Sequence, residues 1–168
     1  MRTKPITYRV PSEVCQVKVL VLRDASTIPP EGDTPERVSN WLLELWKGSE
    51  DFDNSAESMW VVFLNTRRKI TGCQKLSDGM ADTLLVMPGS VFKPAILMDA
   101  KCVVLAHNHP SGDPTPSEAD NRVTRELQRA GQLLKIEVMD HLVLAPHGTP
   151  CESPRRYCSL KELGYFSF

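Results

Sequence analysis

The segment from His107 to Asp120 constrains the fold and chemistry of this chain more than any other part of it. An apolar run over residues 102–106 precedes it and predicts a buried strand, and the amphipathic pattern that follows predicts a helix. Side chains two positions apart on a strand point to the same face, so His107 and His109 can reach one metal ion. Asp120, in the first turn of the helix, can turn back toward them. Two imidazoles, one carboxylate and a water molecule are the usual ligands of a catalytic zinc, so the segment predicts a Zn²⁺ site.

Three neighbouring side chains have alternative interpretations. Asp113 is a rival third ligand because it closely follows His109, although we prefer to interpret it as the cap of the turn at residues 111–112. His141, on a later predicted strand, is interpreted first as a hydrogen-bonded core histidine, with a fourth ligand or a partner of a ligand as alternatives. Asn108 is expected to point away from the histidines and to brace the loop through hydrogen bonds to the backbone.

A zinc hydrolase also needs a donor that stabilises the oxyanion and a base that takes a proton from water. Ser117 stands at the predicted start of the helix, where free amides and a partial positive charge assist the donor role, and it can cap the helix at the same time. The base is harder to place. The predicted strand at residues 69–76 carries no glutamate, and Glu57 falls in or beside a polar stretch that predicts an exposed linker.

The composition is that of an ordinary globular domain, with 168 residues, 41% hydrophobic residues and a formal net charge of −1. Near-neutral charge weakens the case for strong electrostatic binding to DNA, although Arg122, Arg125 and Arg129 recur along one predicted helix face, where solvation is the preferred interpretation. Five scattered cysteines favour a reducing compartment over a disulfide framework. No signal-like or membrane-spanning apolar run is seen, so a cytoplasmic location is expected.

Hydrophobic periodicity and cap residues predict an interleaved set of helices and strands, and hence an α/β fold with a mixed sheet flanked by helices. Thr34 and Pro35 predict a helix start, and Gly48 its end. The remaining helices are expected at residues 88–100, from 115 or 117 to 131, and 159–163. The strands are expected at residues 16–22, 59–64, 69–76, 83–87, 101–106 and 136–145.

The spacing of His107, His109, Ser117 and Asp120 closely resembles the JAMM (MPN+) metalloprotease signature, and the surrounding His-Asn-His-Pro-Ser-Gly-Asp-Pro core is similar to its bacterial RadC branch. Flanking blocks at residues 63–66, 91–95, 140–143 and 159–164 also resemble that branch. The resemblance implies a cytidine-deaminase-like fold over residues 34–168, with residues 1–33 as an N-terminal strand and loop extension. It implies Zn²⁺ held by the two histidines and Asp120, with Ser117 stabilising an oxyanion.

The chain departs from the RadC pattern in two ways. The family's catalytic glutamate is expected a few residues before Gly79, and an ungapped alignment places Gln74 there, which can hydrogen-bond to a water but cannot accept its proton. Residues 1–33 are too short and too strand-like for the helix-hairpin-helix region of full-length RadC proteins. The expected functions are therefore a peptidase or isopeptidase acting on a protein or peptide, an inactive zinc-binding scaffold, or a module associated with DNA repair.

Overall fold

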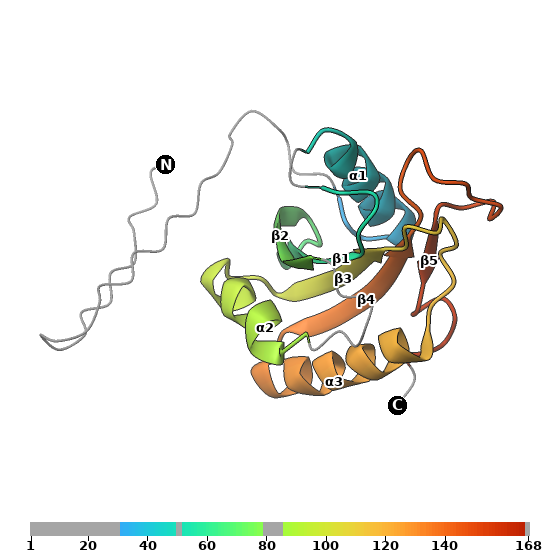
Figure 1. Ribbon diagram of the computed structural model, residues 1–168. Helices are drawn as coiled ribbons and strands as arrows, with labels where there is room; N and C mark the ends of the chain where they lie inside the picture. The colour runs from blue at the N-terminus through green and yellow to red at the C-terminus, as the bar shows by residue number, and fades with distance from the viewer. Residues whose placement is uncertain (1–30, 50–51, 79–85, 167–168) are drawn as a thin grey trace, which may run out of the picture.

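The computed structural model describes residues 31–49, 52–78 and 86–166 (Figure 1). The strand expected at residues 16–22 and the N-terminal extension up to residue 30 lie outside the described residues. So does most of the strand expected at residues 83–87.

A single mixed sheet forms the centre of the described fold, with the strand order β2-β1-β3-β4-β5 (Figure 1). The parallel pair β3–β4 lies in the middle, and the other pairs are antiparallel. The mixed α/β architecture expected from the sequence is therefore confirmed. The strands are β1 (Ser58–Leu64), β2 (Ile70–Asp78), β3 (Cys102–Asn108), β4 (Glu137–Leu144) and β5 (Tyr157–Ser159).

Helices cover both faces of this sheet (Figure 1). Helix α1 (Pro35–Lys47) packs on one face, and Thr34 and Gly48 cap it as the sequence predicts. Helices α2 (Pro88–Leu97) and α3 (Glu118–Leu134) pack on the other face and contact each other. The central strands β1 and β3 are buried along their whole length, which explains why their sequences are continuously apolar and do not alternate.

The register between β1 and β3 brings the polar stretch before β1 to the histidine segment. Met59 pairs with His107, and the antiparallel ladder runs from there to the pair of Leu64 and Cys102. The residues just before Met59 therefore lie beside the residues just after His107. The crossover from β3 through α3 to β4 places the start of α3 at the same end of the sheet, which is the usual position for ligand sites in α/β folds.

Helix α3 begins at the later of its two predicted starts and ends after its predicted end. Its capping box joins Ser117 to Asp120, which corresponds to the later of the two predicted starts. The helix continues past Gly131 to Leu134. Gly131 lies inside it because the returning chain passes so close that a Cβ atom would lie 2.5 Å from the carbonyl oxygen of Ile136.

The C-terminal segment forms a strand and turns where a short helix was expected at residues 159–163. Tyr157–Ser159 pairs with the outer edge of β4, and the amide of Leu160 donates to the carbonyl of His141. Satisfying that open strand edge takes precedence over local helix formation.

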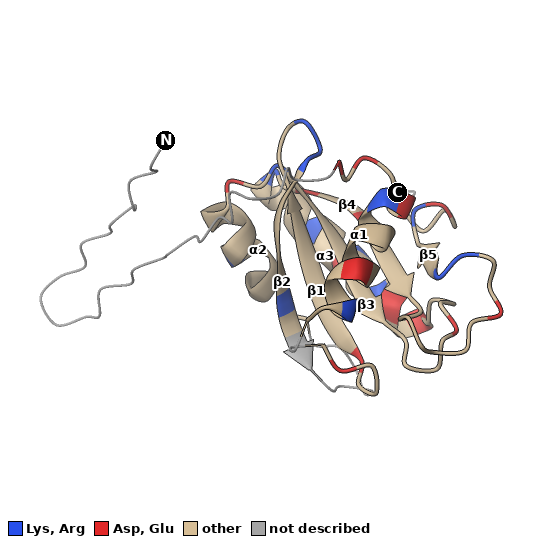
Figure 2. Cartoon of the chain, turned by 90° about the horizontal axis from the view of Figure 1, so that it is seen from above, with Lys and Arg blue, Asp and Glu red and all other residues tan. Residues whose placement is uncertain are grey.

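Basic and acidic residues are interspersed along the described part of the chain (Figure 2). Arg122, Arg125 and Arg129 are exposed on α3, in agreement with a solvated face. Among the described helices, none combines the length and apolar character needed to cross a lipid bilayer.

The two helical glycines provide a matched test of this packing. Gly131→Ala should lower the free energy of unfolding by about 1–3 kcal/mol, because the new methyl group meets backbone that cannot easily move. Gly89→Ala, where a Cβ atom meets nothing within 4 Å, should be neutral or stabilise by up to about 1 kcal/mol. Urea unfolding of both variants measures the difference, and equal effects would contradict the close approach at Gly131.

Candidate metal centre

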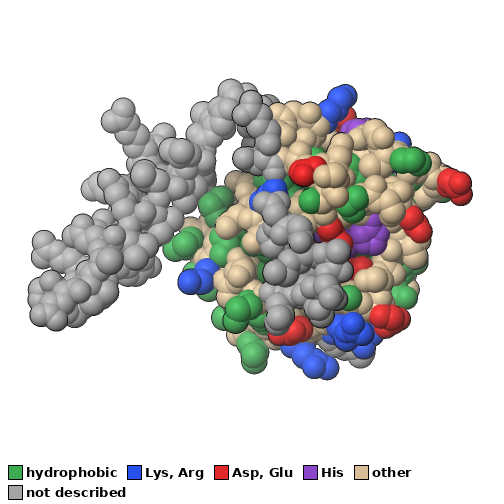
Figure 3. All heavy atoms as spheres, viewed as in Figure 1, with side chains coloured by type: hydrophobic (Ala, Val, Ile, Leu, Met, Phe, Trp, Pro, Cys, Tyr) green, Lys and Arg blue, Asp and Glu red, His purple; other side chains and the backbone are tan. Residues whose placement is uncertain are grey.

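Two histidines stand at the carboxyl end of β3, beside the start of α3. His107 belongs to the strand, and the amide of His109 extends the ladder by donating to the carbonyl of Leu144 (2.9 Å). Both rings therefore lie on the same side, with centroids 4.9 Å apart. Histidine atoms reach the surface near the end of β3, with acidic side chains beside them (Figure 3). The shared face expected from the His-x-His spacing is confirmed.

Three donor atoms surround Nε2 of His107, which is fully buried. Nε2 of His109 lies 3.1 Å away, Oδ1 of Asp120 3.2 Å away and Oε1 of Glu57 3.7 Å away. Ligand atoms of Glu57, His107 and His109 all lie within 4.8 Å of one another. The structure thus brings together the three residues expected to bind metal, and it adds Glu57 to them.

The proton on His109 is placed by Asp113. Nδ1 of His109 lies 2.8 Å from the carbonyl oxygen of Asp113, which can only accept, so Nδ1 carries the hydrogen and Nε2 presents a lone pair. The carboxylate of Asp113 does not compete as a ligand here, since its Oδ1 accepts from the amide and hydroxyl of Thr115. Gly112 (φ +83°) allows this tight loop, where a Cβ atom would overlap the carbonyl oxygen of Pro150.

The proton on His107 is placed through a buried chain of hydrogen bonds. The hydroxyl of Thr124 donates to the carbonyl of Asp120 (2.6 Å), so its oxygen accepts from Nδ1–H of His141 (2.6 Å). Nε2 of His141 then accepts from Nδ1–H of His107 (2.9 Å), which leaves Nε2 of His107 unprotonated. Burial lowers the pKa of His141 to about 4, so this ring is neutral at pH 7. Of the alternatives for His141, the structure shows a partner that orients His107.

The donor set fits a divalent cation. The unprotonated Nε2 atoms of His107 and His109 lie 3.1 Å apart, and Oδ1 of Asp120 lies 3.2 Å from Nε2 of His107. None of these three atoms carries a hydrogen that could form a hydrogen bond between them. Burial and the neighbouring His141 hold the pKa of His107 well below its usual value. This ring therefore does not readily take up a proton that would relieve the repulsion between the lone pairs. A cation removes the repulsion between these donors, and imidazole with carboxylate suits zinc and related transition metals.

Asp120 is oriented by the residue that caps its own helix. Its Oδ2 accepts from both the amide (2.6 Å) and the hydroxyl (2.7 Å) of Ser117, while Oδ1 turns to His107. Burial alone would raise the pKa of Asp120, but His107 and the two Ser117 donors outweigh burial and lower it. Ser117 itself is exposed, which leaves its hydroxyl accessible from solvent.

Glu57 lies beside His107 and not in the exposed linker that the sequence predicts. It immediately precedes β1, and the β1–β3 register carries it to His107. Burial raises the pKa of the Glu57 carboxyl above its usual value, and nearby Asp120 acts in the same direction, although His109 opposes them. The sequence signal that could have found it is its position directly before an apolar run that predicts a buried central strand.

Gln74 lies elsewhere. It sits on β2 opposite Val61, which is two residues along β1 from the partner of His107, and its side chain is exposed. Because β1 lies between β2 and β3, the backbone of Gln74 is about 10 Å from β3, the strand that carries His107. The structure therefore does not bring Gln74 to the other predicted site residues.

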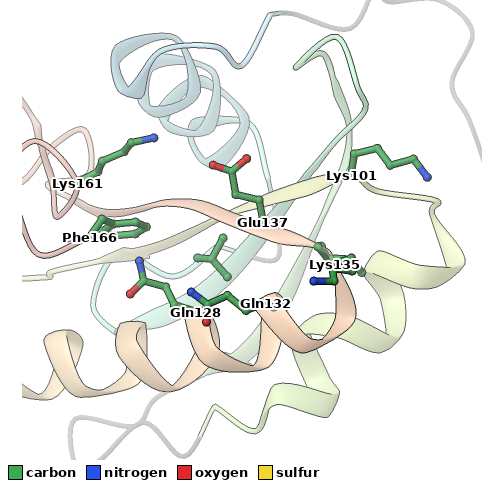
Figure 4. Close-up of a pocket in the computed structure, with 10 residues that line it drawn as sticks. Lys101, Gln128, Gln132, Lys135, Glu137, Lys161 and Phe166 are labelled. Carbon is green, nitrogen blue, oxygen red and sulfur yellow. The ribbon is translucent and has the colours of Figure 1, made fainter. Parts of the chain in front are cut away.

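A cavity of about 520 Å³ lies at the opposite end of β3 and β4, between these strands and the last turns of α3 (Figure 4). Its lining includes Lys101, Gln128, Lys135, Glu137 and Phe166, and none of the histidines. It is separate from the candidate metal centre.

Comparison with known proteins agrees with this arrangement. Residues 33–165 match the family described as RadC-like JAB domain. A UPF0758 protein of Caldanaerobacter subterraneus is 42% identical over 135 residues, which cover 80% of this chain and 52% of the relative. A UPF0758 protein of Desulfitobacterium hafniense is 44% identical over 137 residues, which cover 82% of this chain and 55% of the relative.

A third UPF0758 protein, from Symbiobacterium thermophilum, is 44% identical over 110 residues, with 66% of this chain and 44% of the relative covered. The matched part thus spans about half the length of these relatives. The match to the family extends over nearly all of the described residues, from α1 to the turns that follow β5. The chain belongs to the RadC-like JAB domain family.

Proposed function

We propose that this chain is a zinc-dependent hydrolase that cleaves peptide or isopeptide bonds in a protein or peptide substrate. The observation that carries this proposal is the convergence of two unprotonated imidazole nitrogens and a carboxylate oxygen beside a half-buried glutamate. A purely structural zinc site is usually closed by four protein ligands, whereas catalytic sites leave one position for water or substrate.

His107, His109 and Asp120 would hold the cation. Asp120 suits the ligand role better than Glu57 does, because two Ser117 donors fix its orientation and because its Oδ1 lies closer to His107. When bound, the cation would supply Lewis acidity that activates a water molecule and polarises the substrate carbonyl.

Glu57 is then free for proton transfer. Its carboxylate would accept a proton from the attacking water and deliver it to the departing amine nitrogen, which must be protonated to leave. The raised pKa of Glu57 suits a group that both takes and returns a proton.

Ser117 would donate its hydroxyl to the oxyanion that forms when water attacks the amide carbonyl. That hydroxyl now donates to Asp120, so it must rotate toward the substrate during the reaction. Asp120 keeps its bond from the Ser117 amide throughout, which holds the carboxylate in place while the hydroxyl moves.

Hydrolysis can be tested with the zinc-loaded chain and a panel of peptides that includes isopeptide-linked lysines. We expect cleavage that stops when a chelator removes the metal and returns when zinc is restored. A chain that binds zinc at one equivalent and cleaves nothing in the panel would favour the scaffold function.

Asp120→Ala should abolish tight zinc binding, because it removes a ligand, and the loss should exceed the 10–100-fold that is roughly typical for residues that only orient ligands. Asp113→Ala is the matched control, since that carboxylate bonds only to Thr115 in the site loop. Competition with a zinc-binding dye measures both affinities. Loss of zinc from Asp113→Ala with retention in Asp120→Ala would reverse the ligand assignment.

Thr124→Val should weaken zinc binding by about 10–100-fold, although the Thr124 hydroxyl contacts the Asp120 backbone carbonyl and His141 and not the proposed ligand atoms. Without the hydroxyl acceptor, His141 no longer holds its proton on Nδ1, and His107 can shift its own proton to Nε2, which removes the lone pair. Thr71→Val, which also removes a hydroxyl that donates to a backbone carbonyl, is the control. Equal zinc affinities in the two variants would show that the buried chain does not set the state of His107.

Glu57→Gln should retain zinc and lower kcat by about 100- to 10,000-fold, because an amide cannot accept the proton. Gln74→Ala should leave kcat unchanged, since that side chain is exposed on β2. Steady-state kinetics on the best peptide from the panel distinguish the two positions. If Gln74→Ala lowered kcat and Glu57→Gln did not, the base would have been misplaced.

A further inference from the structure

We propose that Asn108 is a positioning residue that fixes Glu57 against the histidines, an inference that rests on the proton-transfer role proposed for Glu57. Asn108 lies between His107 and His109, and strand alternation turns its side chain to the opposite face of the sheet. It is fully buried and has no place among the metal ligands. Its carboxamide therefore serves another purpose.

Both polar ends of this carboxamide bind the residues that flank Glu57. Nδ2 donates to the carbonyl of Ala56 (2.8 Å), and Oδ1 accepts from the amide of Ser58 (2.9 Å). The hydroxyl of Ser58 donates to the same Oδ1 (2.9 Å). The backbone on each side of Glu57 is thus tied to the residue between the two histidines.

The hydrogen bonds of the Asn108 side chain extend the pairing of β1 with β3 beyond its last backbone pair. The β1–β3 register stops at the pair of Met59 and His107, so a ladder carried one step further would place Ser58 opposite Asn108. The side-chain amide of Asn108 supplies the acceptor and the donor that a further backbone peptide would supply. Glu57 is held as if it were still part of the strand, although it lies one residue before the start of β1.

A hydrogen bond from the hydrophobic core also holds Ser58 in place. The indole Nε1–H of Trp60 donates to the hydroxyl oxygen of Ser58 (3.0 Å), and Trp60 packs against Trp46 of α1 with ring centroids 5.9 Å apart. Ser58 and Trp60 are both buried. Displacing Ser58 would therefore break a second hydrogen bond within the core, which makes the backbone next to Glu57 stiff.

Asparagine is the side chain that suits this position. Aspartate has an acceptor at the same reach but no N–H donor for the Ala56 carbonyl, while serine has one hydroxyl that cannot reach both groups together. Glutamine carries the right groups on a chain one carbon longer, which a fully buried site does not accommodate without displacement.

The test compares Asn108→Ala with Asn65→Ala in the zinc-loaded chain. Asn65 also binds backbone through its side chain, accepting from the amides of Arg67 and Lys69, but at the far end of β1. We expect Asn108→Ala to keep zinc affinity within about 3-fold of the parent while kcat falls about 100-fold or more, toward the level of Glu57→Gln. Asn65→Ala should change neither quantity. If Asn108→Ala does not fold, Asn108→Asp replaces it, since it removes only the donor to Ala56.

A double-substitution cycle separates positioning from general support. If Asn108 acts through Glu57, adding Asn108→Ala to Glu57→Gln should cause little further loss of kcat. An equal loss in both backgrounds, or a fall in zinc affinity that parallels the fall in kcat, would overturn the proposal, because Asn108 would then support the histidines.

A second readout needs no substrate, so it separates this inference from the proposed function. In Asn108→Ala, the Ser58 amide should exchange its hydrogen about 10-fold faster or more, which corresponds to the loss of one buried hydrogen bond, while the Val61 amide stays unchanged. The carbon NMR signal of the Glu57 carboxyl should move or broaden. If the parent chain cleaves nothing, the proposed function fails and these signals alone decide the positioning. An unchanged Glu57 signal would contradict it.

Discussion

The placement of protons on two imidazole rings is the constraint on which the rest of the site depends. Each ring donates its Nδ1 hydrogen away from the centre, His109 to the Asp113 carbonyl and His107 to His141. The Nε2 lone pairs of both rings must then point into one small space, which the carboxylate of Asp120 also borders. Such a cluster is electrostatically unfavourable by itself, and it becomes favourable when a cation occupies it. The hydrogen bonds made by the two Nδ1 atoms thus favour the binding of a cation between the rings.

The sheet topology brings four separate segments to that volume. The end of β3 supplies the histidines, the cap of α3 supplies Ser117 and Asp120, β4 supplies His141, and the residue before β1 supplies Glu57. Parallel pairing of β3 with β4 and antiparallel pairing of β3 with β1 make the carboxyl end of β3 the common meeting point. Asn108 joins the fourth segment to the first, so ligands and proposed base share one backbone framework.

The local part of this site could be predicted from the sequence, and the long-range part could not. The proposed metal ligands lie within one short segment, so strand and helix periodicity sufficed to predict that His107, His109 and Asp120 lie close together. Glu57 depends on a pairing register between strands about 50 residues apart, which no local pattern encodes. The polar stretch that contains Glu57 predicts a linker, whereas the family pattern points to the strand that carries Gln74, whose side chain is exposed.

The same distinction holds for the fold. Helix α1 was predicted at both ends because its caps are local. Gly131 suggested the end of α3, but it lies inside the helix, at a close approach to Ile136 that the returning chain creates. The predicted C-terminal helix was wrong: its first residue, Ser159, pairs with the edge of β4, and turns follow from residue 160.

X-ray absorption spectroscopy of the zinc-loaded chain identifies the atoms bound to the metal and so tests the proposed ligands. We expect one zinc per chain with two imidazole nitrogens and oxygen donors, and no sulfur. A spectrum with fewer than two imidazoles, or with sulfur from any of the five cysteines, would contradict this ligand assignment.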